Sequence, residues 1–403
     1  MSHQGQSGGE TAPAFFGARI ALLYSALFFF VGIQLPFFPL WLKSRGLDET
    51  SISLVLAVPL LARITTSGQI SAFADRASDR ANVLIFLFVA SALLVALFPV
   101  TTGFATILAV ALALSVVSNP LTPIMDSLTL SGVRRFGADY GRIRLWGSVV
   151  FIIANLGGGA VLASYDIESV LWVMIASAFA GAALSPLLPR IGMRRSLQPG
   201  APAGSLAMLA RPRFLLVMLA SGLLQASHAM LYGFGSIHWG SIGYSGTVIG
   251  LLWATGVLVE IILFHLASAV FRHVTPFSLI VIGAGGAIAR WSLMPLEPPL
   301  AGFVVLQMLH GLSFGAVHLG TMHFLAEEIA DERMGSAQGA AFMLGGIVMA
   351  LAVLLSGPLY GTWGISAFLA MAAMSGLALV LLLAARHSYP HNLLDGGETR
   401  EVE

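Results

Sequence analysis

The chain has 403 residues, of which 57% are hydrophobic and 10% are charged, and its formal net charge is +1. Soluble domains carry about 25% charged residues, so this composition, with a mean hydropathy of +0.88, excludes an ordinary soluble domain. The absence of cysteine excludes disulfides, thiolate metal sites and cysteine nucleophiles. The near-neutral net charge gives no reason to expect a nucleic-acid partner.

Twelve apolar segments follow a polar start. Residues 1–14 lack the apolar core of a cleavable signal peptide, so we expect the first segment to direct membrane insertion. Each segment is roughly 20 residues long or longer, the length a helix needs to cross about 30 Å of hydrocarbon. The predicted spans are 16–42, 50–73, 81–100, 104–131, 140–163, 167–188, 213–238, 246–270, 275–294, 299–326, 336–360 and 364–385. The sequence therefore predicts an all-α, polytopic membrane protein.

The basic residues in the connections and at the ends of the spans are distributed asymmetrically. With the N-terminus inside, fifteen arginines fall on the cytoplasmic face, whereas the opposite face holds only Lys43 and Arg45. The fifteen are Arg19, Arg76, Arg80, Arg134, Arg135, Arg142, Arg190, Arg194, Arg195, Arg211, Arg213, Arg272, Arg333, Arg386 and Arg400. Because Lys and Arg concentrate in cytoplasmic loops, both termini are predicted to be cytoplasmic.

The longest connection, "PRIGMRRSLQPGAPAGSLAMLARPR", joins the sixth and seventh spans. It is basic and rich in Pro and Gly, as expected of a flexible linker. It divides the chain into two halves of six spans, a layout typical of transporters that rock around a midplane site. The predicted parts are an N-terminal tail (1–15), a six-helix bundle (16–188), a linker (189–212), a second six-helix bundle (213–385) and a C-terminal tail (386–403).

Five charged residues lie well inside predicted spans, away from their first and last few residues: Arg63, Asp126, Arg144, Glu260 and Arg290. A charge at the bilayer centre costs about 2.5–3.5 kcal/mol, so such residues normally face a cavity or a partner. Arg63 is expected to take part in helix packing. Asp126 and Arg144 both lie roughly 8 Å from the cytoplasmic surface on adjacent antiparallel helices, at about 1.5 Å per residue. Their matched depth predicts an ion pair that lines a cavity; the alternatives are a purely structural pair or an arginine that reaches the surface.

In the second half, Glu260, Arg290 and His310 lie at similar depth on consecutive spans. An acid, a base and an imidazole in this arrangement indicate a proton relay, since histidine titrates near neutral pH. The alternative is a satisfied structural network. Phe37, Tyr232 and Trp253 offer rings for an aromatic substrate, and His228 is either a substrate contact or a helix-packing partner.

An intramembrane metal centre or an enzyme is not indicated. His310, His318 and His323 lack the spacing of a zinc hydrolase, and the chain has no H-E-x-x-H or Walker motif. We therefore expect no metal, no cofactor and no catalytic site.

After the second span comes "SAFADRASDR", residues 71–80. It resembles the loop signature of the major facilitator superfamily in Asp75, Arg76 and Arg80, although Ser71 and Ser78 replace glycines. We expect these three charged residues to gate the cytoplasmic end through charge-assisted hydrogen bonds to neighbouring helix ends.

A closer resemblance runs nearly end to end. The segments "LPFFPLWLKSRGL", "DYGRIRLWGSVVFI", "LLQASHAMLYGFGSIHW", "LLWATGVLVEIILF" and "LQMLHGLSFGAVHL" resemble the phenylpropionate permease group. That group is related to the lactose-permease family of oligosaccharide:proton symporters. The resemblance implies a major facilitator fold and proton-coupled uptake of a small aromatic carboxylic acid.

The relation to the symporters carries over residue by residue. Asp126 and Arg144 match their substrate-binding acid and arginine. Glu260, Arg290 and His310 match a charged network, but Ser313 stands where the symporters have a proton-carrying glutamate. The proton is therefore expected on Glu260, Asp126 or His310, or it enters with the acid substrate.

The sequence thus predicts a monomeric secondary transporter of the bacterial inner membrane. Its expected substrate-binding residues are Asp126, Arg144, His228, Tyr232, Trp253 and Arg290. The alternatives in the same class are a symporter of a neutral sugar or nucleoside and a small-drug exporter. A channel or a receptor without turnover is the alternative from another class, and it is disfavoured by the buried charges.

Overall fold

The computed structural model describes residues 12–77, 79–191, 211–329 and 331–387, apart from a few side chains at the helix ends. Regular structure in these residues is helical. In the first half the helices are α1 (Phe16–Ser44), α2 (Glu49–Arg76), α3 (Arg80–Val95), η1 (Phe98–Val100), α4 (Phe104–Ser118), α5 (Leu121–Phe136), α6 (Tyr140–Ser164), α7 (Ile167–Leu184) and η2 (Ser185–Leu187).

The second half contains the remaining helices. They are α9 (Pro212–Ala226), η3 (Leu231–Gly235), α10 (Ser236–Ser241), α11 (Gly246–His265), α12 (Ala267–Val270), α13 (Pro276–Leu293), η4 (Met294–Leu296), α14 (Leu300–Met308), η5 (Gly311–Ala316), α15 (Val317–Glu328), α16 (Asp331–Trp363), η6 (Gly364–Ala367) and α17 (Phe368–His387). Each of the twelve predicted spans coincides with one helix or with consecutive helices in line, so the predicted class is confirmed.

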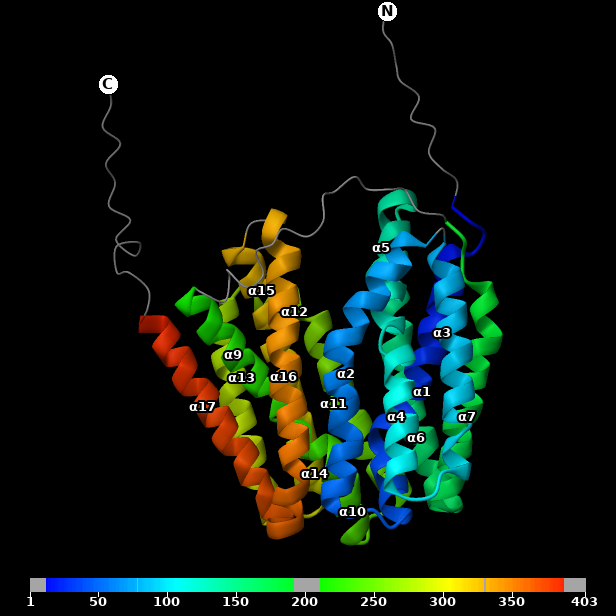
Figure 1. Cartoon of the computed structure of the whole chain (residues 1–403). Helices are drawn as coiled ribbons and strands as arrows, with labels where there is room; N and C mark the ends of the chain where they lie inside the picture. The colour runs from blue at the N-terminus through cyan, green and yellow to red at the C-terminus, as the bar shows by residue number, and fades with distance from the viewer. Residues whose placement is uncertain (1–11, 78, 192–210, 330, 388–403) are drawn as a thin grey trace, which may run out of the picture.

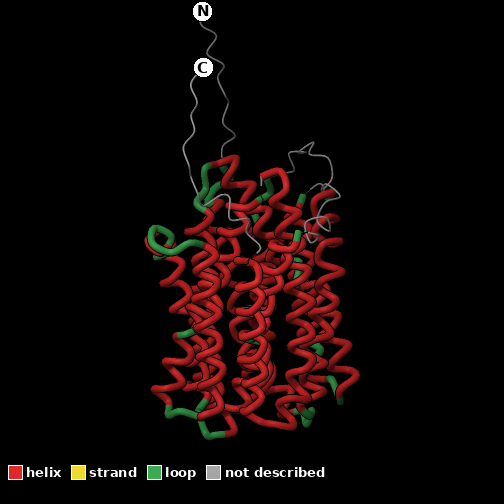
Figure 2. The backbone as a smooth tube through the Cα atoms, turned by 90° about the vertical axis from the view of Figure 1, so that its left-hand side faces the viewer, coloured by secondary structure: helices red, strands yellow, loops and turns green. Residues whose placement is uncertain are grey.

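The helices run side by side, and their connections gather at the two ends of the molecule (Figures 1 and 2). The described chain begins and ends at the same end, here called the terminal side; the opposite end is the far side. Eleven stretches of the described residues are long and apolar enough to cross a membrane, and the last, Ala337–Arg386, contains most of α16 and of α17. Because this stretch is 50 residues long and turns at η6, it accounts for two crossings.

The helices form two six-span bundles, α1–α7 and α9–α17. Within the first bundle α1 packs on α6 and α7, and α3 packs on α4 and α7. Within the second, α9 packs on α16 and α17, and α13 packs on α15 and α17. Two extensive contacts join the bundles: α2 with α16, and α6 with α11. The predicted linker, residues 189–212, lies for the most part outside the described residues, so the predicted boundaries stay a prediction.

Both contacts between the bundles are tight at the far side. A Cβ atom on Gly159 of α6 would lie 2.5 Å from the carbonyl oxygen of Gly246 of α11. A Cβ atom on Gly357 of α16 would lie 2.3 Å from Oγ of Ser53 on α2, and Ser53 donates a hydrogen bond of 3.1 Å to the Leu354 carbonyl. Glycine at these positions lets the backbones of opposite bundles touch, which closes the far side.

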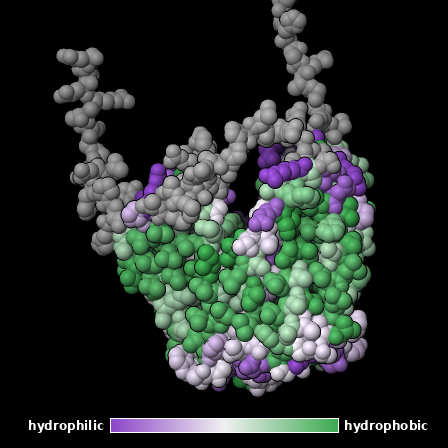
Figure 3. All heavy atoms as spheres, in the orientation of Figure 1, coloured by the Kyte–Doolittle hydropathy of each residue, from purple (hydrophilic) through white to green (hydrophobic). Residues whose placement is uncertain are grey.

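At the terminal side the bundles part. The space-filling view shows a hollow between them that opens at this end, above a broad hydrophobic belt that covers the middle of the molecule (Figure 3). Polar residues gather at both ends of that belt. The structure is therefore closed at the far side and open at the terminal side.

Candidate functional site

In the first bundle, Asp126 of α5 is held by two tyrosines. Tyr24 of α1 donates a hydrogen bond to Oδ1 of Asp126, and Tyr140, the first residue of α6, donates to the same atom at 3.1 Å. The carboxylate thus obtains its hydrogen bonds from neutral hydroxyl groups. Sequence reasoning missed both tyrosines. Tyr24 lies 102 residues from Asp126 in the chain, and Tyr140 lies 14 residues from it on another helix.

The ion pair expected between Asp126 and Arg144 is not formed in this conformation. Instead, the guanidinium carbon of Arg144 lies 4.0 Å from the ring centre of Phe28 on α1, a cation–π arrangement. Nη1 of Arg144 is buried and has no hydrogen-bond partner among the described residues. A Cβ atom on Gly147 would lie 2.9 Å from this nitrogen and 3.0 Å from the Phe28 ring, so glycine makes room for the stack. The expectation was wrong because tyrosine hydroxyl groups already satisfy the carboxylate.

In the second bundle, Arg290 of α13 is 1% exposed and makes three hydrogen-bond contacts through its two terminal nitrogens. Its Nη1 contacts Nδ1 of His310 at 3.2 Å and donates to Oγ of Ser313 at 3.0 Å. Its Nη2 donates to Oε1 of Gln307. No carboxylate of the described residues pairs directly with this guanidinium. A buried charge is thereby stabilised by neutral acceptors alone.

The donors in this network can be assigned because arginine only donates. Since Nδ1 of His310 accepts from Arg290, the proton of a neutral His310 ring lies on Nε2, which is 3.4 Å from Oε2 of Glu260 on α11. The chain of contacts therefore runs from Arg290 through His310 to Glu260. The structure thus brings together the three residues that the sequence placed at similar depth.

A second branch leaves Arg290 through Ser313. Nδ1 of His228 lies 3.1 Å from the Gln225 carbonyl, so this nitrogen carries the proton. Its Nε2, 3.1 Å from Oγ of Ser313, accepts the hydroxyl proton. His228 is fully buried and therefore belongs to the same network. Ser313, Gln307 and His228 are the members that sequence reasoning did not assign to it.

Two π-helical segments shape this bundle. Tyr232 lies in η3 and Ser313 in η5, and both segments interrupt the long helices that carry His228 and His310. Single π-turns inside α-helices occur frequently at functional sites, because the extra residue per turn shifts side chains out of regular register. Tyr232 stacks on Trp253 with ring centres 6.0 Å apart, and the Trp253 indole donates a 2.8 Å hydrogen bond to Ser236.

The two clusters face each other across the bundle interface. The Glu260 carboxylate of the second bundle is within electrostatic range of Arg144 of the first. The cluster of the first bundle and that of the second therefore influence each other electrostatically.

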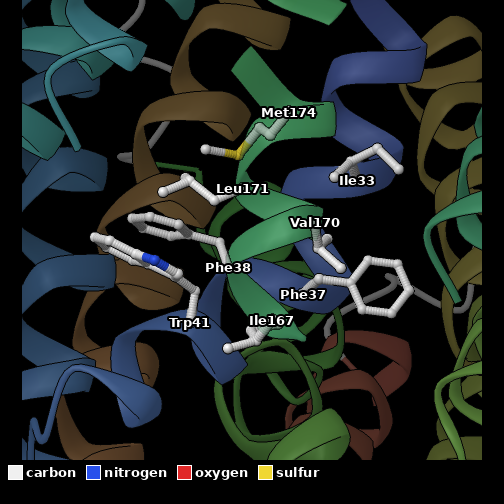
Figure 4. A pocket seen from close by; sticks show the side chains of 8 residues that line it. All are labelled: Ile33, Phe37, Phe38, Trp41, Ile167, Val170, Leu171 and Met174. Atoms are coloured by element: carbon white, nitrogen blue, oxygen red, sulfur yellow. The ribbon is translucent and has the colours of Figure 1, made fainter. Parts of the chain in front are cut away.

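A small apolar cavity lies elsewhere, between α1 and α7 towards the far side (Figure 4). Its volume is about 10 Å³, and its eight lining side chains are Ile33, Phe37, Phe38, Trp41, Ile167, Val170, Leu171 and Met174. A polar, larger space is needed to hold even one ordered water, so this cavity is a packing void. Phe37, whose ring the sequence suggested as a surface for an aromatic substrate, lies here.

The predicted gating residues lie at the terminal side. Arg76 is exposed at the end of α2, and Arg80 donates a 3.2 Å hydrogen bond to Ser131 of α5. The Asp75 side chain lies outside the described residues. Asp79 caps α3 by accepting from the Ala81 amide at 2.9 Å. The gating role of these residues stays a prediction.

Comparisons with known proteins agree with this architecture. A family model described as the MFS_1 like family matches residues 18–371. The chain is 33% identical over 372 residues to the probable 3-phenylpropionic acid transporter of Escherichia coli strain K12, covering 90% of this chain and 96% of that protein. It is 25% identical over 377 residues to the maltose permease of Geobacillus stearothermophilus, covering 91% and 94% of the two chains.

Among solved structures, the crystal structure of the nucleoside transporter NupG matches with a TM-score of 0.81 at 17% identity. The match covers 93% of this chain and 100% of that one, and it shows the fold alone. The family model, the 33% identical relative and the two six-span bundles lead to one conclusion. The chain belongs to the MFS_1 like family of the major facilitator superfamily and is a membrane transporter.

Proposed function

We propose that this transporter takes up a small aromatic carboxylic acid, similar to 3-phenylpropionate, together with a proton by alternating access. One observation carries the proposal: the guanidinium of Arg144 has a buried nitrogen without a hydrogen-bond partner and lies against an aromatic ring. Buried polar groups normally have a partner, so an unsatisfied cation in a membrane protein calls for an anionic ligand.

The chemistry of Arg144 suits a carboxylate. A guanidinium binds a carboxylate through two parallel hydrogen bonds, which a lysine ammonium does not reproduce. The ring of Phe28 beside it offers an aromatic surface to the rest of the ligand. Asp126 does not compete for the guanidinium in this conformation, because Tyr24 and Tyr140 donate to it. We assign the anionic end of the substrate to Arg144 on this basis.

The proton is assigned to Glu260. Among the described residues, Glu260 is the carboxylate in contact with the Arg290–His310 network, and Ser313 of that network does not carry charge. Glu260 is also within electrostatic range of Arg144. A substrate anion on Arg144 would remove a cation that favours the charged form of Glu260, so anion binding and proton uptake would favour each other.

The relatives support an acid but leave room for a neutral substrate. The relative of 33% identity is described as a probable transporter of 3-phenylpropionic acid. The relative of 25% identity is a maltose permease, which favours a neutral sugar as the second candidate. A nucleoside or a small exported drug is a further alternative in the same superfamily.

We further propose that the terminal side is cytoplasmic and that the protein is a monomer in the bacterial inner membrane. The fifteen-to-two distribution of basic residues supports this orientation. In that orientation the structure is open to the cytoplasm. Reporters after Arg195 and at Glu297 should report the cytoplasm and the outside respectively, and the reverse result for both would contradict the orientation.

The substrate assignment is tested with Arg144→Lys and a matched control, Arg142→Lys, at an exposed position one half-turn earlier. Binding of 3-phenylpropionate and of its uncharged amide is measured by calorimetry on purified protein. Loss of hydrogen bonds to a charged group should weaken acid binding by at least about tenfold in Arg144→Lys. Amide binding should stay within about twofold, and Arg142→Lys should change neither.

Two outcomes would contradict the assignment. Equal loss of acid and amide affinity in Arg144→Lys would show that the substrate carboxylate does not bind Arg144. No acid binding by the wild type, with binding of maltose or a nucleoside in the same assay, would establish the neutral-substrate alternative.

A further inference from the structure

Asn155 lies where the two bundles meet at the closed far side. It is located on α6, one helical turn before Gly159, so both residues lie on the same helix face. A Cβ atom on Gly250 of α11 would lie 2.3 Å from the Asn155 carbonyl oxygen. Asn155 is therefore part of the close contact between α6 and α11, and its side chain is 0% exposed.

The side-chain amide of Asn155 has no hydrogen-bond partner at either end. Both Oδ1 and Nδ2 are buried without a partner among the described residues. Ser53, a buried polar residue of the contact between α2 and α16, differs in this respect, because it donates to the Leu354 carbonyl. Since buried amides normally bond to protein or water, the burial of the Asn155 amide opposes closure of the far side.

We propose that Asn155 sets the equilibrium between the two access states of the transporter by destabilising the state in which the far side is closed. When α6 and α11 separate, water reaches the amide and satisfies it. The close glycine contacts of Gly159, Gly246 and Gly250 act in the opposite direction, because they favour the packed interface. Asn155 thus keeps the closed state from becoming so stable that the far side does not reopen.

The proposal follows from the population arithmetic of a two-state carrier. A ligand shifts an equilibrium only by its differential affinity for the two states, so a carrier whose empty states are close in free energy needs the smallest shift to cycle. The proposal rests on alternating access within the proposed function. It does not depend on the identity of the substrate or of the proton carrier, so its test is separate from theirs.

The experiment measures the opening of the far side directly. The chain has no cysteine, so two spin labels can be attached at Thr102 and Thr362 after replacement by cysteine; both residues are exposed at the far side, one in each bundle. Pulsed electron paramagnetic resonance of the ligand-free protein in lipid gives the closed-to-open ratio from the distance distribution. The variants are Asn155→Leu, Asn155→Ala and Asn155→Asp, measured at pH 8.

We expect the closed-to-open ratio to be lower in Asn155→Asp than in the wild type, and higher in Asn155→Leu and Asn155→Ala. Leu and Ala remove the unsatisfied amide with opposite changes in volume, so a rise in both reports polarity and not packing. We expect a rise of about tenfold, which corresponds to about 1.4 kcal/mol. Asn155→Asp should lower the ratio, because an ionised carboxylate is harder to bury than an amide. If the far side of the wild type is almost entirely closed, a further rise of the ratio is not measurable. The fall expected for Asn155→Asp then decides the test.

Ser177→Ala is the matched control. Ser177 is a buried polar residue of α7 in the same bundle, but its hydroxyl donates a 2.7 Å hydrogen bond to the Met174 carbonyl. Ser177→Ala should leave the closed-to-open ratio unchanged. The proposal is overturned if Leu and Ala lower the ratio, or if Asn155→Asp fails to lower it. It is equally overturned if Ser177→Ala raises the ratio as much as Asn155→Ala does.

Discussion

The polar clusters of the two bundles differ in how well their arginines are satisfied. Arg144 in the first bundle has a buried nitrogen without a partner and lies against Phe28. Arg290 in the second bundle contacts His310, Ser313 and Gln307 through its two terminal nitrogens. Both arginines lie inside membrane-spanning helices. They are nevertheless in different situations, since both terminal nitrogens of Arg290 have hydrogen-bond partners and a buried terminal nitrogen of Arg144 has none among the described residues.

This contrast separates a group available to a ligand from a group that organises the protein. A satisfied buried network fixes its members, and removal of one member leaves the others without partners. An unsatisfied donor gains most from a ligand that supplies an acceptor. On this basis we assign substrate recognition to the first bundle and proton handling to the second.

The largest expected effect is on the free energy of unfolding, and it tests whether Arg290 is more important for stability than Arg144. Arg290→Gln should lower the free energy of unfolding by at least about 3 kcal/mol, because hydrogen bonds to a charged group contribute about 1.5–3 kcal/mol each. Arg144→Gln should lower it by about 1–2 kcal/mol, since it removes two cation–π contacts, with Phe28 and Tyr24, and no ion pair. Denaturation of both variants in the same detergent measures the difference. Equal destabilisation would mean that Arg144 is as structural as Arg290.

The second prediction concerns coupling. Glu260→Gln removes the ionisable group next to His310 but keeps a side chain of the same shape. We expect accumulation of substrate against its gradient to be lost in proteoliposomes with an imposed pH gradient, whereas exchange of internal for external substrate stays within about threefold. If the variant still accumulates substrate, the proton is carried elsewhere, and Asp126 is the next residue to test.

The third prediction sharpens the account of the first bundle. Removing both hydroxyl groups with Tyr24→Phe and Tyr140→Phe leaves Asp126 free to pair with Arg144. The pair would compete with an acid substrate, so the affinity for 3-phenylpropionate should fall by about three- to tenfold. Adding Asp126→Asn should restore it, and calorimetry on the three proteins measures both steps. A fall that Asp126→Asn does not reverse would count against competition between the two carboxylates.

The smallest effect lies outside both clusters. Asp166 precedes α7 and accepts hydrogen bonds from the backbone nitrogen of Ser169 at 3.0 Å and from its hydroxyl at 2.9 Å, which hold the pKa of this carboxyl below its ordinary value of 3.8. A lowered folded-state pKa contributes stability above the unfolded-state value, and this contribution is lost as the pH falls through the folded-state value.

Asp166→Asn should therefore lower the melting midpoint on the order of 1 °C at pH 7, because the group is fully exposed. The difference from the wild type should disappear in acid. Melting curves between pH 3 and pH 7 test this expectation, and a difference that grows in acid would contradict it.

The sequence by itself determined the number and approximate limits of the membrane spans. A crossing helix must satisfy its backbone polar groups internally and be apolar over about 20 residues, so each crossing leaves a local signal. The charges placed inside spans were visible for the same reason, because each is exceptional in hydrocarbon. Depth along the helices was enough to group Glu260 with Arg290 and His310, which the structure brings into contact.

Only the tertiary structure decided which groups satisfy those charges. Depth does not specify the direction in which a side chain points, so Asp126 and Arg144 were matched in depth although Asp126 contacts Tyr24 and Tyr140. The π-helical turns that position Tyr232 and Ser313 depend on packing between helices and have no signal in residue spacing. The unsatisfied amide of Asn155 likewise belongs to a residue whose backbone packs against α11 of the other bundle, and a contact between segments distant in sequence is not encoded in local periodicity.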